Sequence, residues 1–75
     1  MARRRRVVAM IAWESYGNRW RLHPGVSDTI ARAIRDHGVA TMCRRIGVDS
    51  VALETAAYTG IARPETVEAI KAWLR

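Results

Sequence analysis

The 75-residue sequence predicts a single, mainly helical domain of four helices, with an N-terminal segment that has the pattern of a β-hairpin. Two observations predict the helices: apolar residues recur at helical spacing through the last two thirds of the chain, and glycines follow successive short periodic segments. A third observation, β-branched and aromatic residues on both sides of a turn sequence, favours strands near the N-terminus. The chain therefore divides into a basic arm (1–6), a hairpin or short extension (7–24) and a helical domain (25–75).

The N-terminal segment 7–22 is read as a hairpin from its residue types. Residues 7–13 are β-branched, aliphatic and aromatic, and residues 19–22 alternate polar with apolar side chains. Between them, Tyr16-Gly17-Asn18 has turn chemistry, because glycine and asparagine tolerate the positive φ of tight turns. This pattern favours a β-hairpin, and a short helix through Ala12 is the alternative.

An isolated two-stranded hairpin is unstable in water, so its aromatic residues need a surface to pack against. We expect Trp13 and Trp20 to pack on the helical body or on a partner chain. Strands paired between two chains would bury both tryptophans together with Ile11, which makes this segment our candidate dimerisation element.

The first helix is predicted to follow Pro24 and to end before Gly38. Ser27 is a good N-cap, and Asp28 then lies in the first turn, near the positive end of the helix. The residues at helical spacing are Val26, Ile30, Ala33, Ile34 and His37.

Three shorter helices are predicted after Gly38. The second runs from about 39 to 46 and ends at Gly47, and the third is capped by Asp49 or Ser50 and runs to about 59. Pro64 and Glu65 mark the first turn of the fourth helix, where proline loses nothing by lacking an N–H group. The expected apolar stripe of this last helix comprises Val67, Ile70, Trp73 and Leu74.

Residues 39–60 have the spacing of a helix-turn-helix. Small Cys43 lies four residues before Gly47, where two helices must approach closely, and β-branched Val48 follows the glycine. Leu53 lies six residues beyond the glycine, and the opposite face of its helix is left free to enter a groove. The residues expected to close the wedge between the two helices are Met42, Cys43, Ile46, Val48, Leu53 and Ala56.

In this region the sequence resembles the lambda-repressor-like DNA-binding superfamily, which includes the phage Cro and repressor proteins and the LacI-type headpieces. The resemblance covers residues 26–74 and implies a regulator of transcription, a repressor of the phage or mobile-element kind. It also implies a homodimer on double-stranded DNA, with half-sites about one helical turn apart. The matching residues are Met42-Cys43, Ile46-Gly47-Val48-Asp49, Leu53, Ala56, Arg63-Pro64-Glu65-Thr66 and Ile70.

The resemblance places the base-reading positions on Ser50, Val51 and Thr55, with Glu54 and Tyr58 beside them. Serine and threonine hydroxyls can hydrogen-bond several base edges, a valine can contact a thymine methyl group, and a glutamate can accept from a cytosine amino group. None of these positions holds an arginine or asparagine, so this helix has no strong bidentate contact to guanine or adenine.

The charge of the chain also points to nucleic acid. Thirteen Lys and Arg against seven Asp and Glu give a net charge of +6 and a pI near 11.1, and twelve of the thirteen cations are arginine. The alternatives are a solvated helix face for the arginine pair on the second helix and a solubilising tail for the N-terminal arm. The candidates for phosphate or minor-groove contacts are Arg3, Arg4, Arg5, Arg6, Arg44, Arg45 and Arg63.

Other functional classes have little support. A single cysteine, Cys43, excludes an internal disulfide and indicates a reducing compartment, and no ligand spacing for a metal or catalytic triad is present. The longest apolar run, 7–13, has seven residues, far short of the ~20 that span a membrane. We therefore expect a cytoplasmic, nucleoid-associated protein that is not an enzyme and carries no cofactor.

Two other functions stay open. A helix-turn-helix scaffold can serve as a protein-binding module, with Asp49 and Glu54 facing a basic partner. Alternatively, the arginine arm alone could drive nonspecific binding to nucleic acid or to a membrane surface.

Overall fold

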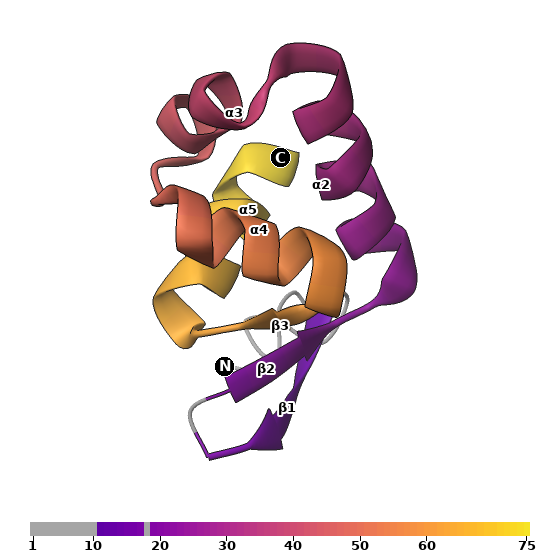
Figure 1. Cartoon of the computed structure of the whole chain (residues 1–75). Helices are drawn as coiled ribbons and strands as arrows, with labels where there is room; N and C mark the ends of the chain where they lie inside the picture. The colour runs from indigo at the N-terminus through magenta and orange to yellow at the C-terminus, as the bar shows by residue number, and fades with distance from the viewer. Residues whose placement is uncertain (1–10, 18) are drawn as a thin grey trace.

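The computed structural model describes residues 11–17 and 19–75, and in them four helices stand on a small three-stranded antiparallel sheet (Figure 1). This arrangement confirms the prediction of a mainly helical domain with an N-terminal hairpin. The elements are β1 (Ala12–Tyr16), β2 (Arg19–Leu22), α2 (Pro24–His37), α3 (Val39–Ile46), α4 (Ser50–Thr59), β3 (Ile61–Ala62) and α5 (Pro64–Leu74).

The sheet joins the hairpin to the segment between α4 and α5. β1 pairs antiparallel with β2, and the alternative of a helix through Ala12 is wrong because Ala12 lies opposite Leu22 in this pairing. β2 also pairs with β3, where Trp20 lies opposite Ala62. The two-residue strand β3 was not predicted from the sequence. It forms because β2 lies alongside it, and a pairing between distant segments leaves no pattern in so short a stretch.

Helix α2 begins earlier than the sequence predicted. Ser27 as its N-cap is wrong: the N-cap is His23, Pro24 occupies the first turn, and the N–H of Ser27 already donates to the His23 carbonyl at 3.2 Å. Proline is favoured in the first turn because its φ is already helical and the missing N–H would have no partner there. The helix ends as predicted at Gly38, whose N–H donates to the Ile34 carbonyl at 2.8 Å.

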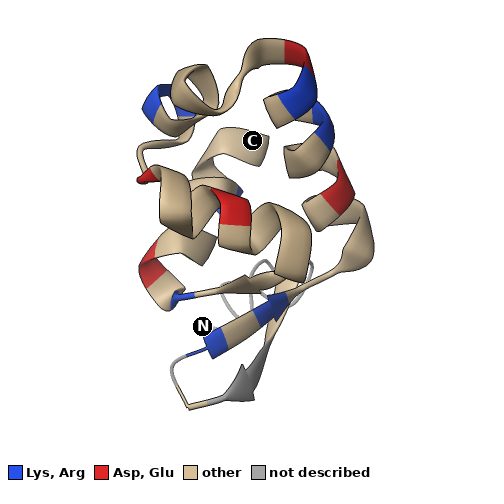
Figure 2. Cartoon of the chain, viewed as in Figure 1, with Lys and Arg blue, Asp and Glu red and all other residues tan. Residues whose placement is uncertain are grey.

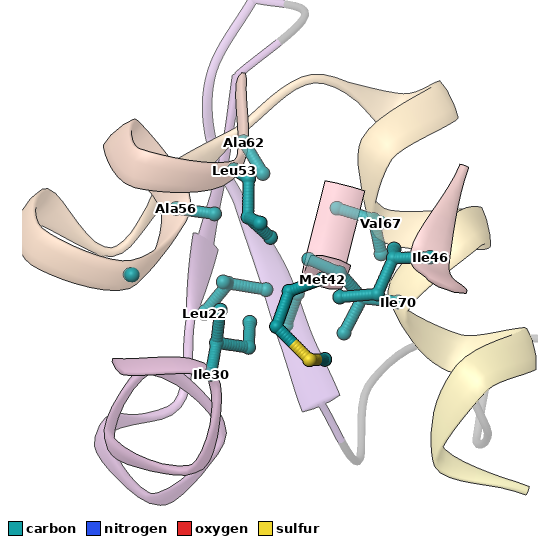
Figure 3. Packing of buried hydrophobic residues seen from close by; sticks show 11 residues of the cluster. Leu22, Ile30, Met42, Ile46, Leu53, Ala56, Ala62, Val67 and Ile70 are labelled. Atoms are coloured by element: carbon teal, nitrogen blue, oxygen red, sulfur yellow. The ribbon is translucent and has the colours of Figure 1, made fainter. Parts of the chain in front are cut away.

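One hydrophobic core joins the helices and the sheet (Figure 3). Its centre is formed by large side chains from all four described helices, and the hairpin contributes Ala12 and Leu22 to the same cluster. The hairpin is therefore part of the folded unit. In α5 the predicted stripe is buried at Val67 and Ile70, whereas Leu74, in the last position of the helix, is exposed. The largest fully buried side chains are Ile30, Met42, Leu53, Val67 and Ile70.

Candidate nucleic-acid interface

The turn between α3 and α4 is made by Gly47. This residue has φ 87° and ψ 36°, in the left-handed region, and its N–H donates to the Cys43 carbonyl at 2.8 Å. A Cβ at this position would meet nothing within 4 Å. Glycine is therefore favoured here for its backbone conformation and not for lack of space.

The wedge between α3 and α4 is closed as the sequence predicted. Met42 and Ile46 from α3 and Leu53 and Ala56 from α4 are buried, which confirms the predicted inner face of both helices. The two remaining residues of the predicted wedge, Cys43 and Val48, are half-buried and pack against this cluster. Packing on this side fixes which face of α4 is turned outward.

Helix α4 is capped by Asp49. The Asp49 carboxylate accepts a hydrogen bond of 2.7 Å from the backbone N–H of Ala52, three residues into the first turn. Of the two caps that the sequence allowed, Asp49 is the one used, and Ser50 becomes the first residue of the helix. The carboxylate also lies at the positive end of the helix, where a negative charge is stabilised.

The outer face of α4 carries the residues that were predicted to read bases. Ser50, Glu54 and Tyr58 follow one another at intervals of four residues and are all exposed, so they form one row along the helix. Val51 is 73% exposed and Tyr58 is 65% exposed, which is high for side chains of these types. Thr55 differs from the other four because it is half-buried at the edge of this face.

A hollow of about 540 Å³ lies beside this face, on the side of Val51 and Thr55. Its walls come from the first turns of α4 and α5 and from the paired strands β2 and β3, so three parts of the chain that are distant in sequence meet there. The lining residues with charged or hydroxyl side chains are Arg19, Asp49, Thr55, Arg63, Glu65 and Thr66.

The basic residues lie on other elements than α4. Figure 2 shows α4 with acidic and no basic colouring, in agreement with its sequence. The predicted phosphate-binding residues Arg44 and Arg45 occupy the last turn of α3, and Arg63 stands at the N-cap of α5; all three are exposed. Within the described residues none of the three forms an ion pair, so their guanidinium groups are open to an external anion.

Sequence reasoning missed Arg19 as a site residue. It is exposed at the start of β2 and lines the hollow together with Arg63. The alternating pattern of residues 19–22 predicted the strand. It gave no information about which other element the strand would approach.

Most of the net charge lies in the arm. Residues 11–75 hold nine Lys and Arg against seven Asp and Glu, a net charge of +2, and the other four cations are Arg3 to Arg6. The predicted arm contacts, Arg3, Arg4, Arg5 and Arg6, lie outside the described residues. The helical domain by itself is therefore only weakly basic.

The predicted dimerisation residues are separated by the fold. Ile11 and Trp20 are half-buried and pack against the core of their own chain. Trp13 remains 42% exposed, with its ring centroid 4.7 Å from that of His23. Trp13 is thus the one of the three with substantial free surface.

Comparisons with family models, with curated proteins and with solved structures gave no match, so a function has to be inferred from the geometry of the site. In the part of the chain that the structure describes, no helix is long and apolar enough to cross a membrane.

Proposed function

We propose that this protein binds double-stranded DNA and inserts α4 into the major groove. The observation that supports this proposal is the division of α4 into two faces. Leu53, Ala56 and Ala57 are buried against the rest of the domain, while Ser50, Val51, Glu54 and Tyr58 are exposed. An α-helix held by one face and open on the other fits the width of the major groove of B-DNA.

The chemistry of this face suits a limited readout of sequence. Val51 is exposed enough to contact a thymine methyl group, and the hydroxyls of Ser50 and Thr55 can donate to or accept from base edges. Glu54 can accept from a cytosine amino group but also repels nearby phosphates. Because α4 lacks arginine, the affinity has to come mainly from cations outside it.

Those cations are Arg44 and Arg45 on α3 and Arg63 at the N-cap of α5, with the arm of Arg3 to Arg6 in addition. Exposed arginines without an ion pair in the described chain are suited to binding phosphate oxygens with two parallel hydrogen bonds. Such contacts position a protein on the duplex and make its affinity fall steeply with salt.

We further propose that the protein is a transcriptional repressor of the phage or mobile-element kind, acts on the nucleoid and binds as a homodimer. Among the described strands β1 is at the edge of the sheet, with β2 as its neighbour, and an edge strand can pair with a strand of a second copy. Trp13 on this strand would be buried by such a pairing. Replacement of Trp13 by Ser should then shift sedimentation from dimer to monomer, and an unchanged dimer would place the contact elsewhere.

The test of DNA binding is selection from a random-sequence duplex library at two salt concentrations, followed by sequencing of the bound fraction. A regulator should enrich one palindromic motif that survives the higher salt. The variant Val51→Ser should then bind the selected motif about tenfold more weakly, in the range of one lost base contact. Leu74→Ser, an exposed apolar residue changed in the same way at the far end of α5, is the matched control.

The lack of basic residues on α4 favours one second candidate, a protein-binding module whose acidic Asp49 and Glu54 face a basic partner. In that case the selection should recover no duplex at either salt concentration. Binding driven by the arm alone should give uniform recovery that disappears at high salt, is lost on deletion of residues 2–6 and does not respond to Val51→Ser.

A further inference from the structure

Thr66 is a buried polar residue with no hydrogen-bond partner among the described residues. It is 4% exposed and lines the hollow between α4 and α5. Two other threonine hydroxyls bond backbone carbonyls, Thr29 that of Gly25 at 2.7 Å and Thr59 that of Thr55 at 2.6 Å, but Thr66 makes no such bond. No fully enclosed side-chain oxygen of the described chain lacks a partner, so the small accessible area of Thr66 must include its hydroxyl oxygen. Because Thr66 lines the hollow, the hollow is where an external partner could reach this hydroxyl.

Backbone N–H groups next to the Thr66 side chain also lack hydrogen-bond acceptors. Thr66 is the third residue of α5, and the N-cap residue, Arg63, makes no side-chain hydrogen bond to the first turn. The first helical bond that closes this turn runs from the N–H of Val67 to the Arg63 carbonyl at 3.0 Å. The N–H groups of Glu65 and Thr66 are left without a capping acceptor, in contrast to the first turn of α4, which Asp49 caps.

Two arginines and two carboxylate residues line the hollow, and they differ in whether they are already engaged within the chain. Arg19 and Arg63 are exposed and make no ion pair within the described chain. Of the two carboxylates, that of Asp49 is already held by the N–H of Ala52. Glu65 is exposed in the first turn of α5, where it is free to turn away from an incoming anion.

We propose that the hollow binds a phosphate group. The Thr66 hydroxyl and the N–H groups of Glu65 and Thr66 donate to its oxygens, at the positive end of α5, and Arg19 and Arg63 balance its charge. The volume of about 540 Å³ is also large enough for the groups attached on either side of a phosphate in a longer molecule.

The source of the phosphate that we propose is the DNA backbone beside the groove that α4 enters, because Val51 and Thr55 of α4 line the same hollow. This step rests on the proposed function, whereas the phosphate site itself does not. A free phosphate ion has the same chemistry and is the other source that the test has to distinguish.

The test uses the full chain and the variant Thr66→Val, which replaces the hydroxyl by a methyl group of nearly the same size. The Thr66 hydroxyl makes no hydrogen bond within the described chain, so its removal takes no bond from the fold and this variant should melt at a temperature no lower than that of the wild type. Its affinity for a random-sequence 20-bp duplex should nevertheless fall about three- to tenfold, and the slope of log affinity against log salt should shrink by about one.

Two further variants serve as comparisons. Glu65→Gln should raise the affinity for the duplex, because it removes a negative charge at the hollow. Thr29→Val, which removes a hydroxyl on α2, should leave affinity and slope unchanged.

A titration with inorganic phosphate, followed by the backbone amide signals of Glu65 and Thr66 in NMR, separates the two sources. If the wild type and Thr66→Val bind the duplex with the same affinity and salt slope, and phosphate moves neither signal, the phosphate site is refuted while DNA binding stands. If the duplex does not bind but phosphate shifts both amides, and Thr66→Val abolishes the shifts, the site stands with a free anion and the proposed function fails. If neither probe binds, both proposals fail.

Discussion

The Asp49 carboxylate accepts a hydrogen bond of 2.7 Å from the N–H of Ala52, and this contact closes the first turn of the helix that we propose enters DNA. Asp49 is also one of the residues that line the hollow in which we place a phosphate. It therefore stabilises the domain through its acceptor oxygen, whereas its negative charge would oppose the DNA binding that we propose. These two effects can be separated by substitution.

Asp49→Ala should lower the free energy of unfolding by about 1 kcal/mol, because the first turn of α4 loses its cap. Asp49→Asn should stay within about 0.5 kcal/mol of the wild type, since asparagine caps about as well as aspartate. The asparagine variant should also bind duplex DNA more tightly, with one negative charge fewer near the phosphates. Urea denaturation and duplex titration measure the two effects. Weaker DNA binding by Asp49→Asn would argue against α4 as the DNA-facing helix.

Gly47→Ala should destabilise the domain by about 1–2 kcal/mol, the cost of placing an L-residue in the left-handed region. The loss should come from the backbone alone, because nothing lies within 4 Å of the added Cβ. Gly25→Ala is the matched control: its Cβ also meets nothing, and its φ is not positive. That variant should be neutral or up to about 1 kcal/mol more stable than the wild type. Equal effects at the two glycines would contradict this explanation of the turn.

Leu53→Ala should destabilise the domain by about 2–5 kcal/mol, because the side chain is fully buried in the hydrophobic core. A domain of this size has little stability to spare, so the far-UV circular dichroism of the variant should show partial unfolding at 37 °C. Val51→Ala lies two residues earlier on the exposed face and should change stability by no more than about 0.5 kcal/mol. A large effect at Val51 would mean that this face is covered in the native assembly.

The helices could be predicted because their ends are local signals. Gly47 and Gly60 end α3 and α4 in the left-handed region, and Asp49 and Pro64 begin α4 and α5. Each of these residues acts on the turn that contains it, so the neighbouring sequence is sufficient. The predicted start of α2 was wrong for a related reason. Two start signals lie close together there, and the helix begins at the earlier one, Pro24, and not at Ser27.

The hollow could not be predicted because it depends on contacts between distant segments. Arg19 reaches it only because β2 pairs with β3, some forty positions later in the chain, through Arg21 opposite Ile61. Thr66 gave no signal either, since a threonine in a first turn is ordinarily exposed and only the packing of α5 buries it. The outward face of α4 was predictable, but the partner for that face was not.

The last prediction concerns the division of affinity between the arm and the helical domain. Deletion of residues 2–6 removes four of the six net positive charges, so the salt slope of duplex binding should shrink by up to about four if all four arginines contact phosphate. Changing Arg44 and Arg45 together to Ala should reduce the slope by about two, because these exposed residues stand in the last turn of α3, the helix that precedes α4.

Arg32 and Arg35, exposed on α2 outside the proposed interface, provide the matched pair. Their double replacement by Ala removes the same charge and should leave the slope almost unchanged. If all three changes reduce the slope in proportion to the charge removed, binding depends on net charge and not on the placement of α4. If the arm deletion weakens binding without changing which motif the selection enriches, the arm supplies affinity and α4 supplies the choice of sequence.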